Sequence, residues 1–165
     1  MSEQTLVGIV MGSTSDWEVM KEAAQICKDF GVSFEARALS AHRTPLELEQ
    51  WMEEMELRGC QAFIAGAGGA AHLAGVVAAK TILPTFGVPI PSKYLKGLDS
   101  LLAMVQMPKG IPVPTLGIGE AGAANAGLSV VAMLALNDVG LKAKLIAFRA
   151  AQAEKVRNAK LPELS

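Results

Sequence analysis

The sequence is poor in the residues on which metal sites and redox chemistry most often depend. Its 165 residues include only two histidines and two cysteines, and 5% of them are aromatic. Cys27 and Cys60 lie far apart and lack the spacing of metal ligands, so we expect reduced, buried thiols in a cytoplasmic protein. Two histidines without a cluster of cysteines or carboxylates make a poor metal site, so no metal site is predicted.

Several nucleotide-binding and nucleophile motifs are missing as well. The sequence contains neither the Walker nor the dinucleotide glycine pattern, and it has no G-x-S-x-G elbow to present a strained nucleophilic serine. With so few aromatic residues, no flavin signature is visible either. The chemistry is therefore expected to need no cofactor.

The distribution of charged and apolar residues argues against a nucleic-acid-binding, secreted or membrane-spanning protein. The net charge is −1 and no block of lysine and arginine occurs, so a nucleic-acid partner is not expected. The N-terminal segment lacks the basic region and long apolar core of a signal peptide, in keeping with a cytoplasmic location. The uncharged stretch 62–79 has the length of a membrane span but consists mostly of alanine and glycine, and no span is predicted.

Small apolar residues are abundant instead. The apolar fraction is 51%, much of it alanine, valine and leucine, with 16 glycines beside them. Such residues allow helices and neighbouring subunits to pack closely. A homo-oligomer is therefore expected.

Short apolar runs alternate with helical patterns along the whole chain, which favours an α/β fold. Right-handed crossovers would give a three-layer, doubly wound parallel sheet of about five strands, flavodoxin-like, in a single domain 1–165. The domain is expected to have a core over about 5–136 and a C-terminal helix over about 141–157. The predicted strands are 6–11, 34–39, 62–65, 82–87 and 113–118. The predicted helices between and after them include 70–79, 95–106 and 121–136.

Two helix starts carry recognisable capping signals. Ser15 and Glu18 have the spacing of a capping box. Thr44 and Glu47 have the same spacing, with Pro45 at the first helical position. These signals place the ends of two loops that follow predicted strands.

Ligands of doubly wound folds bind beyond the carboxyl ends of the strands, where the strand order reverses. The loops "GSTSD", "SAHR" and "GAGGAAH" follow the first three predicted strands, and both histidines lie in or beside them. In "GSTSD", Ser13 can donate to a phosphate and Asp16 can accept from ribose hydroxyls. The alternative is that this segment only caps a helix.

The loop "SAHR" combines Ser40, His42 and Arg43. The guanidinium of Arg43 suits a phosphate, and an unperturbed histidine has a pKa of about 6.5, so both its protonation states are accessible near neutral pH. The alternative is a histidine that caps or packs locally. The glycines of "GAGGAAH" either let the backbone approach a ligand or serve helix–sheet packing, and His72 either faces the pocket or is a buried, satisfied histidine. This combination suits proton transfer on a phosphorylated ribose derivative.

Five motifs in order resemble a known family: "MGSTSDW", "SAHRTP", "AGAGGAAHL", "DSLLAMVQMPKGIPV" and "GAANAGL". They are similar to the bacterial N5-carboxyaminoimidazole ribonucleotide mutases of the PurE type, which are enzymes of de novo purine (IMP) biosynthesis. The resemblance runs from about Leu6 through the final helix. Arg43 and the run 66–72 place the chain with the mutases and not with the related carboxylases that use free carbon dioxide.

The resemblance implies an isomerase that moves a carboxylate from the exocyclic nitrogen of the substrate to ring carbon 4, through release and recapture of carbon dioxide. It also implies a homo-octamer. The alternatives are a carbon dioxide-dependent carboxylase and, more remotely, a flavodoxin-like binding or electron-carrier module. By this resemblance His42 is the acid and base, Ser13, Asp16 and Arg43 bind ribose-phosphate, and Ser40, Ala41 and Gly68 line the carboxylate pocket. His72 is counted with the substrate-binding residues.

Overall fold

The computed structural model of the protein describes residues 5–163, and its centre is a parallel sheet of four strands. The spatial order is β2-β1-β3-β4, so the chain moves outward from β1 to β2 and then crosses back to β3. The reversal of strand order therefore falls at β1 and β3, which are neighbours. The strands are β1 (Val7–Met11), β2 (Phe34–Ala38), β3 (Ala62–Ala67) and β4 (Thr85–Pro89).

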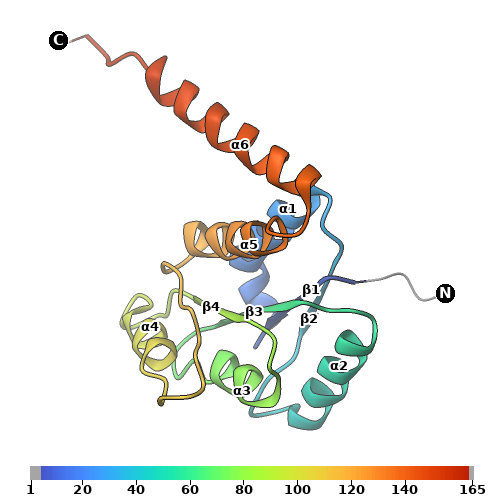
Figure 1. The fold of residues 1–165 in the computed structure, drawn as a ribbon. Coiled ribbons are helices and arrows are strands. Elements are labelled where there is room, and N and C mark those ends of the chain that lie inside the picture. Colours follow the sequence, from blue (N-terminus) through green and yellow to red (C-terminus); the bar gives the residue numbers. More distant parts are fainter. Residues whose placement is uncertain (1–4, 164–165) are drawn as a thin grey trace.

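Helices cover both faces of the sheet (Figure 1). Helices α1 and α5 lie on one face, and α2, α3 and α4 lie on the other. This arrangement confirms the predicted doubly wound, flavodoxin-like fold. The helices are α1 (Trp17–Phe30), α2 (Pro45–Leu57), α3 (Leu73–Lys80), α4 (Leu98–Val105), α5 (Glu120–Leu134) and α6 (Val139–Arg157), with a short 3-10 helix η1 (Thr14–Asp16) before α1.

The core has one part on each face of the sheet. Every residue of β1 and β3 is buried, as expected for strands with helices on both sides. On the first face, α1 and α5 pack closely because Gly127 meets the carbonyl oxygen of Ala23. A Cβ added at Gly127 would stand 3.0 Å from that oxygen and 2.9 Å from the Cβ of Ile26. The predicted role of small residues in close helix packing is confirmed at this crossing.

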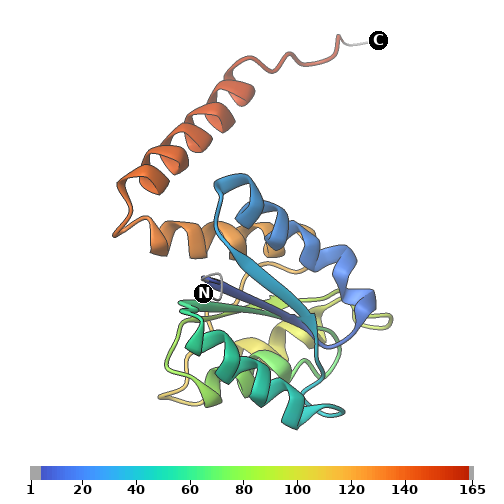
Figure 2. The same cartoon turned by 90° about the vertical axis from the view of Figure 1, so that its right-hand side faces the viewer.

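Helix α6 extends away from this body (Figures 1 and 2). Leu141, near its start, is buried, whereas Val139, Ile146 and Val156 are 86%, 63% and 76% exposed. The helix begins at the edge of the sheet where the strands start, opposite to the edge where they end. Within residues 5–163, no helix is both long and apolar enough to cross a membrane.

The predicted fifth strand is wrong. The segment 113–118 runs beside β4 and forms a single parallel bridge, between Gly87 and Thr115. Two hydrogen bonds flank this bridge, from Gly87 N to the Pro114 oxygen and from Leu116 N to the Gly87 oxygen, both 2.9 Å long. Proline has no N–H to donate, so Pro112 and Pro114 interrupt the regular ladder that a strand requires.

Neither predicted capping box forms at the expected residues. The box before α1 forms two residues earlier than expected, with Ser13 as the cap and Asp16 as its partner. Thr44 precedes α2, but its side chain makes no capping bond. It instead accepts from Ser40 N at 2.8 Å and donates to the Ser40 oxygen at 3.1 Å. Pro45 does occupy the predicted first position of the helix.

Three further boundaries differ from the sequence prediction. Strand β4 begins at Thr85 and not at 82, since Pro84 has no N–H to donate to the ladder and Ile82 is fully exposed. Helix α3 begins at Leu73, which leaves His72 as its N-cap residue. Helix α4 begins at Leu98 because a turn that includes Gly97 at φ 98° precedes it.

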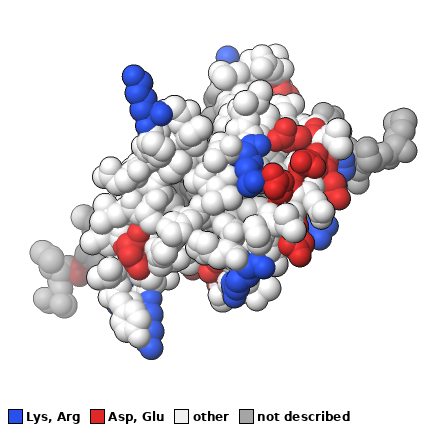
Figure 3. Space-filling model, turned by 90° about the horizontal axis from the view of Figure 1, so that it is seen from below, with Lys and Arg blue, Asp and Glu red and all other residues white. Residues whose placement is uncertain are grey.

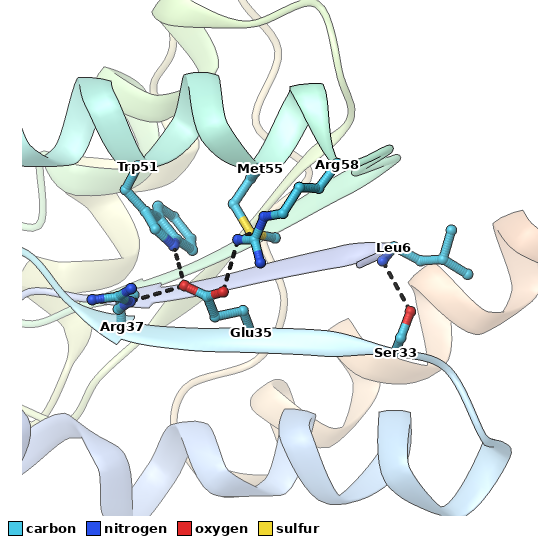
Figure 4. Close-up of polar contacts among 7 residues, drawn as sticks. All are labelled: Leu6, Ser33, Glu35, Arg37, Trp51, Met55 and Arg58. Carbon is cyan, nitrogen blue, oxygen red and sulfur yellow. Dashed lines mark hydrogen bonds and ion pairs between the residues drawn. The ribbon is translucent and has the colours of Figure 1, made fainter. Parts of the chain in front are cut away.

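A polar cluster joins the edge strand β2 to α2 (Figure 4). The carboxylate of Glu35 accepts hydrogen bonds from Arg37 Nε at 2.8 Å, Trp51 Nε1 at 2.8 Å and Arg58 Nη2 at 2.7 Å. Burial by itself would raise the pKa of Glu35. The three hydrogen bonds outweigh it and lower this pKa from 4.5 to about 2.

Replacement of Glu35 by glutamine is expected to lower the free energy of unfolding at pH 7 by about 2–3 kcal/mol, since two arginines lose their charged partner. A depressed carboxyl pKa stabilises the fold above its unfolded value of 4.5, and this contribution disappears as the pH falls toward 2. Urea unfolding at pH 7 and pH 3 measures both effects. The gap between the two proteins should be smaller at pH 3, and an equal gap at both values would contradict the account.

The charges on the face seen in Figure 3 are unevenly distributed. Acidic side chains gather on the side of this face where α2 lies, and much of the remaining surface is uncharged. The acidic side chains of α2 are Glu47, Glu49, Glu53, Glu54 and Glu56. Lys80 at the end of α3 pairs with Glu49 at 2.9 Å, which ties two helices of this face together.

Candidate active site

A cavity of about 390 Å³ opens at the carboxyl ends of β1 and β3, where the strand order reverses. Three loops converge there, namely those that follow β1, β2 and β3, because parallel strands all end at the same edge of the sheet. All the residues singled out in the sequence line this cavity. They are Ser13, Asp16, Ser40, Ala41, His42, Arg43, Gly68 and His72.

The loop after β1 is held by its own side chains. Ser13 Oγ accepts from Ser15 N at 3.3 Å, and the Asp16 carboxylate accepts from Ser13 N at 3.1 Å. Partial burial raises the pKa of Asp16 above its usual value, and the Ser13 amide and the Arg43 charge oppose this rise. Ser13 and Asp16 therefore face the cavity as parts of a fixed turn, and capping and ligand binding can use the same atoms.

The loop after β2 is a tight turn around Ser40. Its Oγ accepts from His42 N at 3.3 Å and from Arg43 N at 3.2 Å. The Arg43 guanidinium reaches across to the first loop, where Nη2 donates to the Gly12 oxygen at 2.9 Å. This contact joins the two loops and keeps a positive charge at the cavity, close to the Asp16 carboxylate.

The two histidines of the chain meet in the cavity. His42 Nε2 lies 2.8 Å from His72 Nδ1, with the rings nearly perpendicular at 89°. One nitrogen must carry the hydrogen and the other must accept it, so each ring restricts the tautomer of its neighbour. The sequence left open whether His72 faces the pocket. The structure places it there, exposed and bonded to His42.

The glycine-rich loop after β3 forms the opposite wall. Ala67, Gly68, Ala70 and Ala71 line the cavity with little side-chain bulk. Gly69 lies between them at φ +65°, a left-handed conformation that favours glycine. The wall can therefore approach a small ligand with backbone atoms.

The geometry adds residues that sequence patterns did not indicate. Gly12 contributes the carbonyl that holds Arg43, and Leu73 lines the cavity beside His72. The contact between the two histidines joins residues thirty positions apart. No local motif signals such contacts, since they exist only once three loops meet. Within residues 5–163, no three histidine, cysteine, aspartate or glutamate side chains form a possible metal site.

The fold and this cavity together define a flavodoxin-like α/β protein with a polar cavity at the switch point of its sheet. The model of the AIR carboxylase family matches residues 6–155. The chain belongs to this family.

Curated relatives cover nearly the whole chain. The N5-carboxyaminoimidazole ribonucleotide mutase of Vibrio parahaemolyticus is 56% identical over 150 residues, which cover 91% of this chain and 93% of the relative. The mutase of Bacillus subtilis is 55% identical over 142 residues, covering 86% and 88%. The solved structure of PurE from Treponema denticola has a TM-score of 0.83 and 28% identity, covering 92% of this chain and 94% of that one. The predicted resemblance is confirmed, and the protein is an isomerase of purine biosynthesis.

Proposed function

We propose that the protein moves the carboxylate of N5-carboxyaminoimidazole ribonucleotide from the exocyclic nitrogen to ring carbon 4. The observation that carries this proposal is the convergence of one imidazole pair, one guanidinium and a glycine-lined wall in a single cavity. The curated relatives at 50–56% identity, all named as mutases for this substrate, support it. The reaction is an isomerisation, so it needs groups that bind, move a proton and keep a released fragment in place.

The sugar-phosphate end of the substrate binds between the loops that follow β1 and β2. Arg43 offers the charge and planar fork that suit a phosphate, and the Ser13 hydroxyl offers a further donor. Asp16 carries negative charge and accepts from ribose hydroxyls, because it would repel phosphate. The Gly12 carbonyl already holds Arg43 at 2.9 Å, so the phosphate meets a side chain that is restricted before binding.

The reaction begins with proton transfer to the exocyclic nitrogen. Protonated His42 gives this nitrogen its proton while the carbon–nitrogen bond of the carbamate breaks, which releases carbon dioxide and the free amine. The electron-rich ring then attacks carbon dioxide through carbon 4, forming the new carbon–carbon bond. Neutral His42 removes the proton of carbon 4 and returns to its first state. One proton leaves and returns, so one acid–base group suffices.

Recapture requires that carbon dioxide stay beside the ring, in the pocket formed by Ser40, Ala41 and Gly68. In the single chain this cavity is open, and both histidines are exposed. A cover must therefore come from elsewhere. We propose that it comes from a second copy of the chain, within a homo-octamer.

Exposed apolar surface supports this assembly. On α4 and the turn before it, Tyr94, Leu98 and Leu102 are 84%, 51% and 50% exposed, and the apolar side chains of α6 are similarly unprotected. Light scattering on the purified protein is expected to give the mass of eight chains. A single-chain mass at the concentration of the activity assay would contradict the assembly.

The experiment that tests the function supplies the carbamate substrate in buffer without added bicarbonate. The mutase is expected to convert it efficiently, and His42→Asn measured in parallel subtracts conversion that does not depend on the histidine. The alternative is a carboxylase that consumes free carbon dioxide, which the family description "AIR carboxylase" favours. Conversion of aminoimidazole ribonucleotide with bicarbonate, but not of the carbamate, would assign the protein to that alternative.

A further inference from the structure

Ser100 is a fully buried hydroxyl in the first turn of α4, a helix whose other residues are mostly apolar. It lies outside the cavity and is not one of the residues in the proposed mechanism. A buried hydroxyl is retained in a protein interior only when its hydrogen bonds are satisfied, since water cannot replace them. The partners of Ser100 therefore indicate its role.

Both partners belong to the end of the β3–β4 ladder. Ser100 Oγ donates to the Ile90 oxygen at 2.8 Å and accepts from Gly69 N at 3.0 Å. The regular ladder reaches its last rung just before, where Ile90 N donates to the Ala67 oxygen at 3.0 Å. In a parallel sheet the next rung would join Gly69 N to the Ile90 oxygen directly. The hydroxyl of Ser100 occupies this rung.

The position of this rung matters because Gly69 lies between residues of the cavity wall. Gly68 on one side and Ala70 on the other line the cavity, and the same loop continues to His72, which bonds His42. Gly69 itself has left-handed φ, and a Cβ added there would meet no atom within 4 Å beyond its chain neighbours. The bond to Ser100 connects this loop to α4.

We propose that Ser100 is a positioning residue whose hydroxyl holds the glycine-rich loop against the cavity, so that carbon dioxide released there is recaptured and not lost. This inference rests on the proposed function. In Ser100→Ala the Gly69 N–H and the Ile90 carbonyl both lose the hydroxyl that partners them. The loop then shifts so that these two groups find other partners. The cavity wall at Gly68 moves with the loop and no longer confines carbon dioxide.

The test measures how much of the carboxylate is exchanged during one turnover. Unlabelled carbamate is mixed with excess enzyme in ¹³C-bicarbonate buffer containing carbonic anhydrase, and the ¹³C content of the product carboxylate is measured by mass spectrometry. The unmodified protein is expected to give nearly unlabelled product, and Ser100→Ala a several-fold higher ¹³C fraction. We expect kcat to fall by roughly 10–100-fold, as for a displaced reacting geometry. KM should change little, since Ser13 and Arg43 belong to other loops.

Two variants separate positioning from general loosening. Thr85→Val removes another buried hydroxyl, 2% exposed, at the start of β4 and away from the cavity, and should leave the ¹³C fraction unchanged. Ser100→Thr keeps the hydroxyl and should restore most of the retention. An unlabelled product from Ser100→Ala, or an equal rise in label in Thr85→Val, would overturn the inference.

A second measurement does not depend on the reaction. Amide hydrogen exchange at Gly69 should be slow in the unmodified protein and at least several-fold faster in Ser100→Ala, with exchange at Ile90 unchanged because its N–H still bonds to Ala67. Unchanged exchange at Gly69 overturns the positioning role. If the unmodified protein fails to convert the carbamate but Gly69 exchanges as expected, the proposed function is wrong while the loop anchor stands.

Discussion

Replacement of His42 by asparagine is expected to lower the rate of carboxylate transfer by at least about 10²–10⁴-fold, the usual contribution of general acid–base catalysis. The loss should lie at or beyond this range because, in the proposed mechanism, His42 acts in both half-reactions, first as the acid at nitrogen and then as the base at carbon 4. Asparagine is of similar size and keeps a polar atom near His72, but it cannot carry the proton.

The measurement is single-turnover conversion of the carbamate at neutral pH, with substrate affinity determined separately. Affinity should change little, so the effect should appear in kcat. Replacement of His72 by asparagine provides the matched control, since it removes the other ring of the 2.8 Å pair. Its effect should be smaller, because it alters the orientation of His42 and leaves the proposed acid in place. Near-normal turnover by His42→Asn would remove His42 from the catalytic role.

Replacement of Arg43 by alanine should raise KM for the ribonucleotide by about 10–100-fold while kcat changes much less, in line with the energy of a charge-assisted hydrogen bond. The guanidinium is placed at the cavity by its bond to the Gly12 oxygen. Its removal takes away the positive charge expected to meet phosphate. It does not remove His42, the group proposed to move the proton.

Arg43→Lys is the informative comparison for this prediction. Lysine keeps the charge but offers no planar fork, so it should recover only part of the affinity. Initial rates over a range of substrate concentrations distinguish the two parameters. An unchanged KM in Arg43→Ala, or a loss confined to kcat, would contradict the phosphate role.

The sequence predicted the cavity well because its loops follow buried strands. The apolar runs of β1 and β3 are recognisable locally, and parallel topology then brings their following loops to one edge. The residues chosen from "GSTSD", "SAHR" and "GAGGAAH" therefore meet in one place. Their chemical roles stay predictions, since proximity does not establish what each side chain binds.

Competition between local signals explains the wrong predictions. Thr44 has the spacing of a helix cap, yet its hydroxyl closes the turn at Ser40, because a nearby backbone offers both a donor and an acceptor. The segment 113–118 has the apolar pattern of a strand, yet its prolines permit only one bridge.

Long-range contacts could not be read from local patterns at all. The His42–His72 bond depends on how far two separate loops reach. Ser100 could have been suspected as the polar residue four positions before the buried Met104, on the inward side of an apolar helix. Its connection to Gly69 required the end of the sheet to be in view.

Helix α6 begins at one edge of the sheet, and the three loops that line the cavity lie at the opposite edge (Figure 2). With a rise of 1.5 Å per residue, the 19 residues of α6 extend roughly 28 Å. Substitutions on α6 therefore leave the side chains of the cavity in place, and substitutions in the loops leave α6 intact. If α6 helps to hold the neighbouring chain that is proposed to cover the cavity, substitutions in this helix will change turnover through that cover and not through the side chains of the cavity itself.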